Sequence, residues 1–151
     1  MSFLRVWVHL NWSTYRRERT INPMIKEMLL RHIVENARSK GIYVDTVNCV
    51  EDHIHVLVSL GPDQALSKVV QLIKGESSHW INQTGALEHK FGWQDDYYAE
   101  SISYSAVPGV REYILGQEEH HRRKSFEEEC REFMERHGFN REDGGLKPSR
   151  E

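Results

Sequence analysis

Residues 52–58 read DHIHVLV, so that two histidines alternate with β-branched residues. Successive side chains of a β-strand point to opposite faces, and a period of two therefore predicts a strand here. Ile54 and Val56 supply the face that packs on the core, whereas His53 and His55 share the other face. We expect this second face to be open to solvent, because the apolar side supplies the buried surface.

Three other segments carry strand patterns. Residues 4–12 alternate between apolar and polar side chains, and residues 97–104 predict a further strand. Residues 42–50 form a β-branched run that only Glu51-Asp52 separates from the histidine strand. This short link predicts that the two strands are antiparallel neighbours.

Helical spacing fills the intervals between these strands. Apolar residues recur every three or four positions from Pro23 onward, and Gly41 stands where a helix C-cap is expected. A second amphipathic pattern follows Asp63, which we expect to be its N-cap, and ends near residues 82–85. The resulting order, β-α-β-β-α-β, predicts an α+β chain with the antiparallel sheet of the ferredoxin-like fold and with two helices on one sheet face.

The C-terminal part predicts two more helices and a tail. One helix begins near Pro108 and runs to about His121, and another begins at Ser125, where Ser and Glu have the spacing of a capping box. We divide the chain into a main domain of residues 1–124, a C-terminal helix of residues 125–139 and a disordered tail of residues 140–151.

The composition indicates an intracellular protein without a general affinity for nucleic acid. Twenty basic and 23 acidic residues give a formal charge of -3, where DNA-binding proteins usually have a basic excess. Cys49 and Cys130 are far apart and lie in no metal-ligand spacing, and no apolar run is long enough to span a membrane. We expect a cytoplasmic protein whose DNA contacts, if any, are local.

Tyr113 and Gln117 on the third helix are four residues apart, so they lie on one helix face and can reach one object. Tyr113 could be a nucleophile beside an oxygen ligand from Gln117. The alternative is that Tyr113 packs in the core with Val110 and Ile114. The histidine pair has the outline of a metal site, but ordinary exposed strand histidines would give the same pattern.

These features occur together with four longer stretches of sequence. The stretches are HLNWSTYRR (9–17), IKGESSHWIN (73–82), FGWQDDYYAESISYS (91–105) and YILGQEEHHRRKSFEEE (113–129). With the histidine pair, they resemble the single-tyrosine HUH transposases of small bacterial insertion sequences, which include the repeat-associated tyrosine transposases. The resemblance extends from Val8 to about Phe126. Two departures affect DNA contacts more than chemistry: Tyr15 replaces a frequent lysine, and Asp95-Asp96 occupy a usually less acidic position.

The resemblance implies a role for each matching residue. His53 and His55 are the HUH metal ligands, Gln117 is the third protein ligand, and Tyr113 is the catalytic tyrosine. Ligand chemistry points to manganese or magnesium without choosing between them, and the resemblance implies Mg²⁺ with Mn²⁺ as a substitute. Attack by Tyr113 on a phosphate leaves a 5′-phosphotyrosine and a free 3′-hydroxyl, so no nucleotide cofactor is needed.

The resemblance also implies the partners. They are single-stranded DNA hairpins at element ends, met in a bacterial cytoplasm near the nucleoid, and a second copy of the chain that exchanges the tyrosine helix; no membrane is involved. The candidate DNA contacts are Arg16, Arg17, Lys74, Arg122, Arg123 and Lys124.

Three other functions are consistent with the sequence. A domesticated nuclease would keep the chemistry without the mobility, and a non-catalytic ferredoxin-like module would stack bases on Trp7 and His9. A metal hydrolase would use His53, His55 and either His120 or His121, with water rather than tyrosine as the nucleophile.

Overall fold

The structure is a computed structural model that describes residues 2–119, 128 and 131–132. The described elements are, in chain order, β1 (Trp7–Ser13), η1 (Tyr15–Arg17), α1 (Pro23–Ser39), β2 (Tyr43–Cys49), β3 (His53–Ser59), α2 (Leu66–Thr84), β4 (Tyr98–Ile102), η2 (Tyr104–Ala106) and α3 (Val107–Leu115). The predicted α+β order is confirmed.

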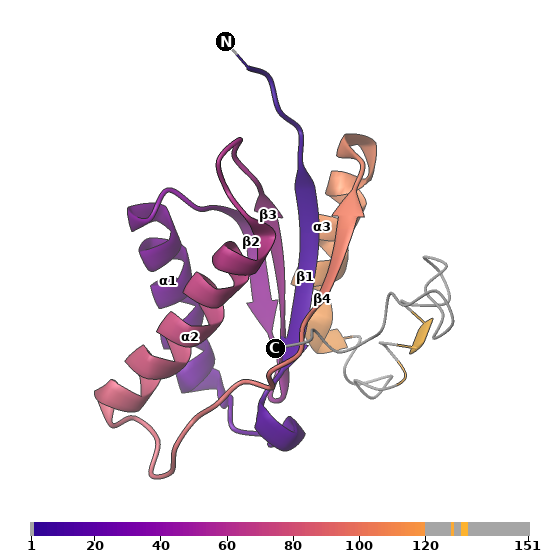
Figure 1. The fold of residues 1–151 in the computed structure, drawn as a ribbon. Helices are drawn as coiled ribbons and strands as arrows, with labels where there is room; N and C mark the ends of the chain where they lie inside the picture. Colours follow the sequence, from indigo (N-terminus) through magenta and orange to yellow (C-terminus); the bar gives the residue numbers. More distant parts are fainter. Residues whose placement is uncertain (1, 120–127, 129–130, 133–151) are drawn as a thin grey trace.

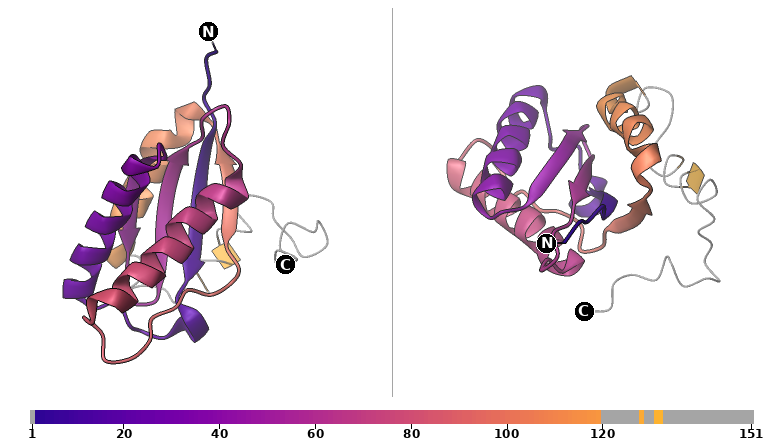
Figure 2. Two further views of the ribbon diagram at one scale, coloured as in Figure 1. Left: turned by 60° about the vertical axis from the view of Figure 1, so that its left-hand side comes forward. Right: turned by 90° about the horizontal axis from the view of Figure 1, so that it is seen from above.

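The four strands form one antiparallel sheet in the order β2-β3-β1-β4, which is the ferredoxin-like arrangement. Helices α1 and α2 lie on one face of the sheet, and α3 lies on the other (Figures 1 and 2). The central strands β1 and β3 are therefore covered on both sides.

The main core lies between the sheet and α1 and α2. Alternate residues of the two central strands point into it, as the period of two predicts: Val8, Leu10 and Trp12 from β1, and Ile54, Val56 and Val58 from β3. The helices contribute residues at helical spacing, among them Ile25, Leu29, Ile33, Val69, Val70 and Ile73. All of these side chains are buried.

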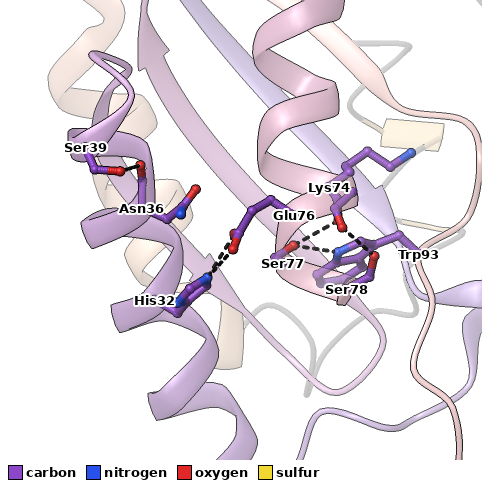
Figure 3. A network of polar contacts seen from close by, with 9 residues as sticks. His32, Asn36, Ser39, Lys74, Glu76, Ser77, Ser78 and Trp93 are labelled. Carbon is purple, nitrogen blue, oxygen red and sulfur yellow. Dashed lines mark hydrogen bonds and ion pairs between the residues drawn. The ribbon is translucent and has the colours of Figure 1, made fainter. Parts of the chain in front are cut away.

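A polar contact ties α1 to α2 on the outer side of this core. Figure 3 shows His32 of α1 facing Glu76 of α2, and the His32 Nε2 atom lies 2.7 and 2.9 Å from the two carboxylate oxygens. The His32 ring also stacks on Trp80, with ring centroids 3.9 Å apart. His32 thus stacks on one residue of α2 and hydrogen-bonds another, and these two contacts fix how α1 and α2 pack against each other.

The helix ends correct one prediction and refine another. Asn22 caps α1, because its side-chain oxygen accepts a hydrogen bond from the backbone N–H of Ile25 at 2.9 Å. Gly85 ends α2 in the left-handed conformation. The prediction that Asp63 caps α2 is wrong, because Ala65 occupies that position and makes no side-chain cap bond.

Helix α3 is shorter than predicted. It ends at Leu115, where Gly116 interrupts the helix, and residues 117–119 are helical again. Glycine in a helix interior is costly because it has more backbone freedom to lose on folding. Most of the predicted C-terminal helix of residues 125–139 and all of the predicted tail of residues 140–151 lie outside the described residues.

Two predictions from composition can be compared with the structure. None of the helices in the described part of the chain is long and apolar enough to cross a membrane. Cys49 is a buried free thiol on β2, and burial raises its pKa to about 12. Cys130 lies outside the described residues.

The Asn22 cap gives a test of the fold. We expect Asn22→Ala to lower the free energy of unfolding by about 1 kcal/mol, because one helix N–H of α1 loses its acceptor. The same substitution inside α1, Asn36→Ala, is the matched control and should be neutral or slightly stabilising, since alanine favours a helix. Urea denaturation followed by circular dichroism measures both, and equal losses of stability would contradict the assigned cap.

Candidate metal and tyrosine site

The histidine pair lies under α3. His53 and His55 are 0% and 2% exposed, and Gln117 is 0% exposed. The prediction that this sheet face is open to solvent is therefore wrong at the histidines. The reason is a second apolar cluster, in which Leu57 of β3 packs against Val107 and Ile114 of α3. The cluster holds α3 on the sheet and closes the face beside it.

His53 lies between a carboxylate and an amide. Its Nδ1 atom is 2.8 Å from the Asp52 carboxylate, and its Nε2 atom is 3.2 Å from Gln117 Oε1. The other end of the amide is fixed, because Gln117 Nε2 donates to the Tyr113 carbonyl at 3.1 Å. The amide therefore turns its oxygen toward His53.

This geometry provides a test of whether a metal fits. If Nδ1 of His53 donates its proton to Asp52, the lone pair of Nε2 faces the lone pairs of Gln117 Oε1. Two acceptors at this distance need a proton or a cation to satisfy both. An imidazole whose second nitrogen is held by a carboxylate is a common arrangement of metal-binding histidines. The residues therefore fit a divalent ion.

His55 is oriented by a residue that the sequence analysis assigned differently. Its Nδ1 atom lies 2.9 Å from Nε2 of His9, and the two rings stack with centroids 5.1 Å apart. His9 is 2% exposed, so the expectation that it stacks bases on an open strand is wrong. Because His9 engages Nδ1, Nε2 is the atom that His55 can offer to a metal. Glu100 lies opposite His9 on β4, and burial raises its pKa to about 7.

Tyr113 stands at the edge of the imidazole group. Its ring centroid is 5.5 Å from that of His55 and 6.0 Å from that of His9, and both contacts are edge-on. The ring also packs against the apolar cluster of Leu57, Val107 and Ile114. Both interpretations of Tyr113 from the sequence thus describe part of its environment, because it packs on the small core and faces the histidines.

Asn48 fixes the end of α3 and was missed by the sequence analysis. Its side-chain amide donates to the carbonyls of Ile114 and Leu115 at 2.9 and 3.3 Å. These carbonyls belong to the last residues of α3, directly before Gly116 interrupts the helix. Asn48 lies opposite His55 in the register of β2 and β3. It therefore ties α3 to β2 at the point where β2 pairs with the histidine strand.

A metal site here depends on Gln117. In residues 2–119, 128 and 131–132, no group of three or more His, Cys, Asp or Glu side chains is placed to hold a metal ion. The candidate set has two imidazoles and one amide oxygen instead. This mixture suits ions that accept both nitrogen and oxygen ligands.

The predicted DNA contacts Arg16 and Arg17 are exposed and lie in η1. Both have a φ of 54°, a region that non-glycine residues enter at a cost of about 1–3 kcal/mol each. Thr14 holds the turn, because its N–H donates to the Asp52 carbonyl at 2.8 Å and its hydroxyl donates to the Glu18 carbonyl at 2.7 Å. The two arginines are thus presented by a strained but well-supported turn.

Lys74 has an observed structural role. Its ammonium donates to the backbone carbonyls of Gln94, Asp95 and Asp96 at 2.6, 2.8 and 3.3 Å. Burial lowers the pKa of Lys74, although the two aspartates oppose this effect. A DNA contact by Lys74 stays a prediction. Five further candidate residues lie outside the described residues: His120, His121, Arg122, Arg123 and Lys124.

Solved structures of two proteins share this fold. A putative transposase from Deinococcus radiodurans matches with a TM-score of 0.62 at 19% identity, over 77% of this chain and 93% of the other. A REP-associated tyrosine transposase bound to a REP hairpin matches with a TM-score of 0.60 at 17% identity, over 80% of this chain and 72% of the other.

Sequence comparison gives relatives of the same kind. The ISDra2 transposase TnpA of Deinococcus radiodurans is 25% identical over 114 residues, which are 72% of this chain and 81% of the relative. The transposase of insertion sequence IS200 from Salmonella typhimurium is 28% identical over 83 residues, which are 52% of this chain and 54% of the relative. The model of the IS200-like transposases matches residues 2–117, which include every described residue of the candidate site. The chain therefore belongs to the IS200-like transposase family.

Proposed function

We propose that this transposase cleaves and rejoins single-stranded DNA with a divalent metal and with Tyr113 as the nucleophile. One observation carries the proposal: His53 Nε2 and Gln117 Oε1 lie 3.2 Å apart, close to His55. The ring centroid of Tyr113 lies 5.5 Å from that of His55. These residues come from β3 and from the region of α3, 58 to 64 positions apart in the chain. A purely structural core has no need to bring two imidazoles, an amide oxygen and a phenol together.

His53, His55 and Gln117 would hold the metal, Mg²⁺ or Mn²⁺. A bound divalent ion would polarise a phosphate and neutralise charge as the bond breaks. Asp52 and His9 would orient the two imidazoles, since each contacts the Nδ1 atom of one of them. Because these side chains are buried under α3, little water would compete with them for the metal.

Tyr113 would carry the covalent step. Its phenol oxygen attacks the phosphorus, the bond from phosphorus to the 3′-oxygen breaks, and the products are a 5′-phosphotyrosine and a 3′-hydroxyl. The phenol must give up its proton, which has a pKa near ~10 in water. A 3′-hydroxyl then attacks the phosphotyrosine and releases Tyr113. The ester keeps the bond energy, so the reaction requires no nucleotide cofactor.

We also propose that the substrate carries DNA hairpins, as the resemblance implies. One structural neighbour is a transposase bound to a REP hairpin, which supports the same class of partner here. The exposed arginines of η1 lie at the end of β1, next to the histidine strand, where they could contact phosphates. The non-catalytic alternative is less well supported, because His9 is buried and bonded to His55.

A homodimer with exchanged tyrosine helices is the proposed assembly. The structure describes one chain, with α3 on its own sheet. Exchange would make the same contacts between two copies. The segment of residues 103–109, which joins β4 to α3 through η2, would have to direct α3 to the partner.

The first prediction concerns the nucleophile. We expect Tyr113→Phe to abolish the covalent protein–DNA adduct while the fold and DNA binding persist, because the ring keeps its packing and loses only the hydroxyl. Denaturing gels with a labelled hairpin oligonucleotide and Mn²⁺ measure the adduct. Tyr104→Phe, a change at an exposed tyrosine, should retain it. An adduct with the Tyr113→Phe protein would refute the assignment.

The second prediction concerns the metal. We expect His53→Ala and His55→Ala each to weaken Mn²⁺ binding at least about 100-fold, since each removes one of three protein ligands and second-shell changes alone cost about 10–100-fold. Titration calorimetry measures the affinity without DNA. His89→Ala, at an exposed loop histidine, is the control and should bind as the unaltered protein does. Unchanged affinity in both site variants would show that these histidines are structural.

The third prediction concerns assembly. If the helices exchange, a heterodimer of a Tyr113→Phe chain and a His55→Ala chain regains cleavage, because one of its sites receives intact histidines and an intact helix. If each chain forms its own site, both sites keep a defect. Co-expression with two different tags allows the heterodimer to be isolated. A verified heterodimer no more active than either single variant would reject the exchange and leave the Tyr113 assignment untouched.

A further inference from the structure

Asn11 lies in the middle of β1, on the sheet face that carries the histidines. Its neighbours Leu10 and Trp12 point into the main core, so Asn11 points the other way, as His9 does. The side chain is 3% exposed. In the part of the chain that the structure describes, its amide oxygen Oδ1 is buried and has no hydrogen-bond partner. Asn11 therefore presents an unused acceptor on the face that α3 covers.

The strand register places Asn11 beside both candidate ligands on β3. Asn11 lies directly opposite His55, and His53, which lies opposite Ser13, is its diagonal neighbour. Directly opposite side chains of an antiparallel pair share a sheet face, with Cβ atoms about 4.5–5.5 Å apart, and diagonal neighbours are about 7–8 Å apart. The unused oxygen of Asn11 thus belongs to the immediate surroundings of the two imidazoles.

A second buried asparagine flanks His55 from the other side. Asn48 of β2 also lies directly opposite His55. Both ends of its amide are engaged, because Nδ2 donates to the Ile114 carbonyl at 2.9 Å and Oδ1 accepts from the Cys49 N–H at 3.0 Å. The two asparagines occupy equivalent positions in the register, but only the contacts of Asn48 explain why an amide is there.

The unused oxygen of Asn11 costs the folded protein free energy. A carbonyl that is buried gives up its hydrogen bonds to water, and most buried polar groups replace these bonds within the protein. Leucine has a similar volume and would avoid this cost, so packing alone does not account for an asparagine at this position. A bound group that takes electron density from the oxygen would account for it.

The chemistry of the neighbouring side chains indicates what this group is. His53, His55 and Gln117 supply two nitrogens and one oxygen, and Asn11 would add a second oxygen. Mg²⁺ and Mn²⁺ prefer oxygen ligands and take six ligands in an octahedral arrangement. Four protein ligands would therefore leave two positions for the DNA, and the second amide oxygen would favour these harder ions.

We propose that Asn11 is a fourth protein ligand, which binds the divalent ion through Oδ1 beside His53, His55 and Gln117. The proposal rests on the proposed metal-dependent function and adds a residue that the histidine motif does not assign. It predicts that one substitution has two opposite effects. An apolar residue at position 11 removes an unpaired buried oxygen, which favours the metal-free fold, and removes a ligand, which weakens metal binding.

Asn11→Leu in the full-length protein tests both effects. We expect its urea midpoint in EDTA to equal or exceed that of the unaltered protein, and titration calorimetry to show Mn²⁺ binding at least about tenfold weaker. Asn48→Leu is the matched control for stability, and its midpoint should fall because the carbonyls of α3 lose their donor. Unchanged Mn²⁺ affinity in Asn11→Leu would overturn the proposal. So would weaker binding with a midpoint as low as that of Asn48→Leu, because Asn11 would then be structural.

Asn11→Asp provides a second measurement if leucine prevents folding. Aspartate keeps the shape and the oxygen and adds a negative charge, so Mn²⁺ should bind at least as tightly as to the unaltered protein. Because a ligand that binds only the folded state stabilises it, Mn²⁺ should also raise the urea midpoint of this variant. Weaker Mn²⁺ binding by Asn11→Asp than by the unaltered protein would contradict a ligand role.

His53→Ala distinguishes a failure of this inference from a failure of the proposed function. If Mn²⁺ binding is lost in His53→Ala but complete in Asn11→Leu, the metal site stands and only the fourth ligand is rejected. If both variants bind Mn²⁺ as the unaltered protein does, the metal site is rejected, and the role of Asn11 is rejected with it.

Discussion

The candidate site depends on the packing of α3 against the second face of the sheet. Leu57 of β3 and the apolar side chains Val107 and Ile114 of α3 form this contact, and all three are buried. Burial of three such side chains contributes several kcal/mol, on the order of 1.5–3 kcal/mol for each. The same contact removes His53 and His55 from solvent and brings Tyr113 and Gln117 over them. Strand β3 thus serves two cores, one on each face.

Polar groups buried by this packing need hydrogen-bond partners, and these partners fix the orientation of the side chains at the site. Asp52 contacts the imidazole of His53, and His9 contacts that of His55. Gln117 lies between His53 and the Tyr113 carbonyl. Asn48 donates to the last carbonyls of α3. An unpaired buried polar group costs about 1–3 kcal/mol, so the bonds of Asn48 and Gln117, which join the sheet to the end of α3, also stabilise the docked helix. The network therefore positions the candidate ligands and helps to hold α3, which couples the local chemistry to the fold.

The sequence predicts the fold well because periodicity reports which side of an element is buried. The period of two in β1 and β3 and the helical spacing in α1 and α2 arise from the main core, where burial follows local pattern. Prediction from sequence fails where contacts between distant parts of the chain determine whether a residue is buried. The docking of α3, the role of His9 and the Asn48 contact each join residues at least 46 positions apart, and no local pattern encodes such pairs. Gly116 did signal the end of α3, but the helix prediction continued past it.

Strand β1 connects the candidate metal site with the exposed arginines of η1. His9 on this strand contacts His55, and the strand ends at Ser13, shortly before the strained turn of Arg16 and Arg17. Strain of this kind persists only when the surroundings fix it, and here Thr14 and the side-chain oxygen of Gln94, which accepts from the Arg16 N–H at 3.3 Å, do so. Helix α2 contributes from the opposite face through Lys74, whose ammonium donates to the Gln94 carbonyl. The main core therefore contributes to the candidate site indirectly, because it fixes β1, which carries His9 and leads into the turn of Arg16 and Arg17.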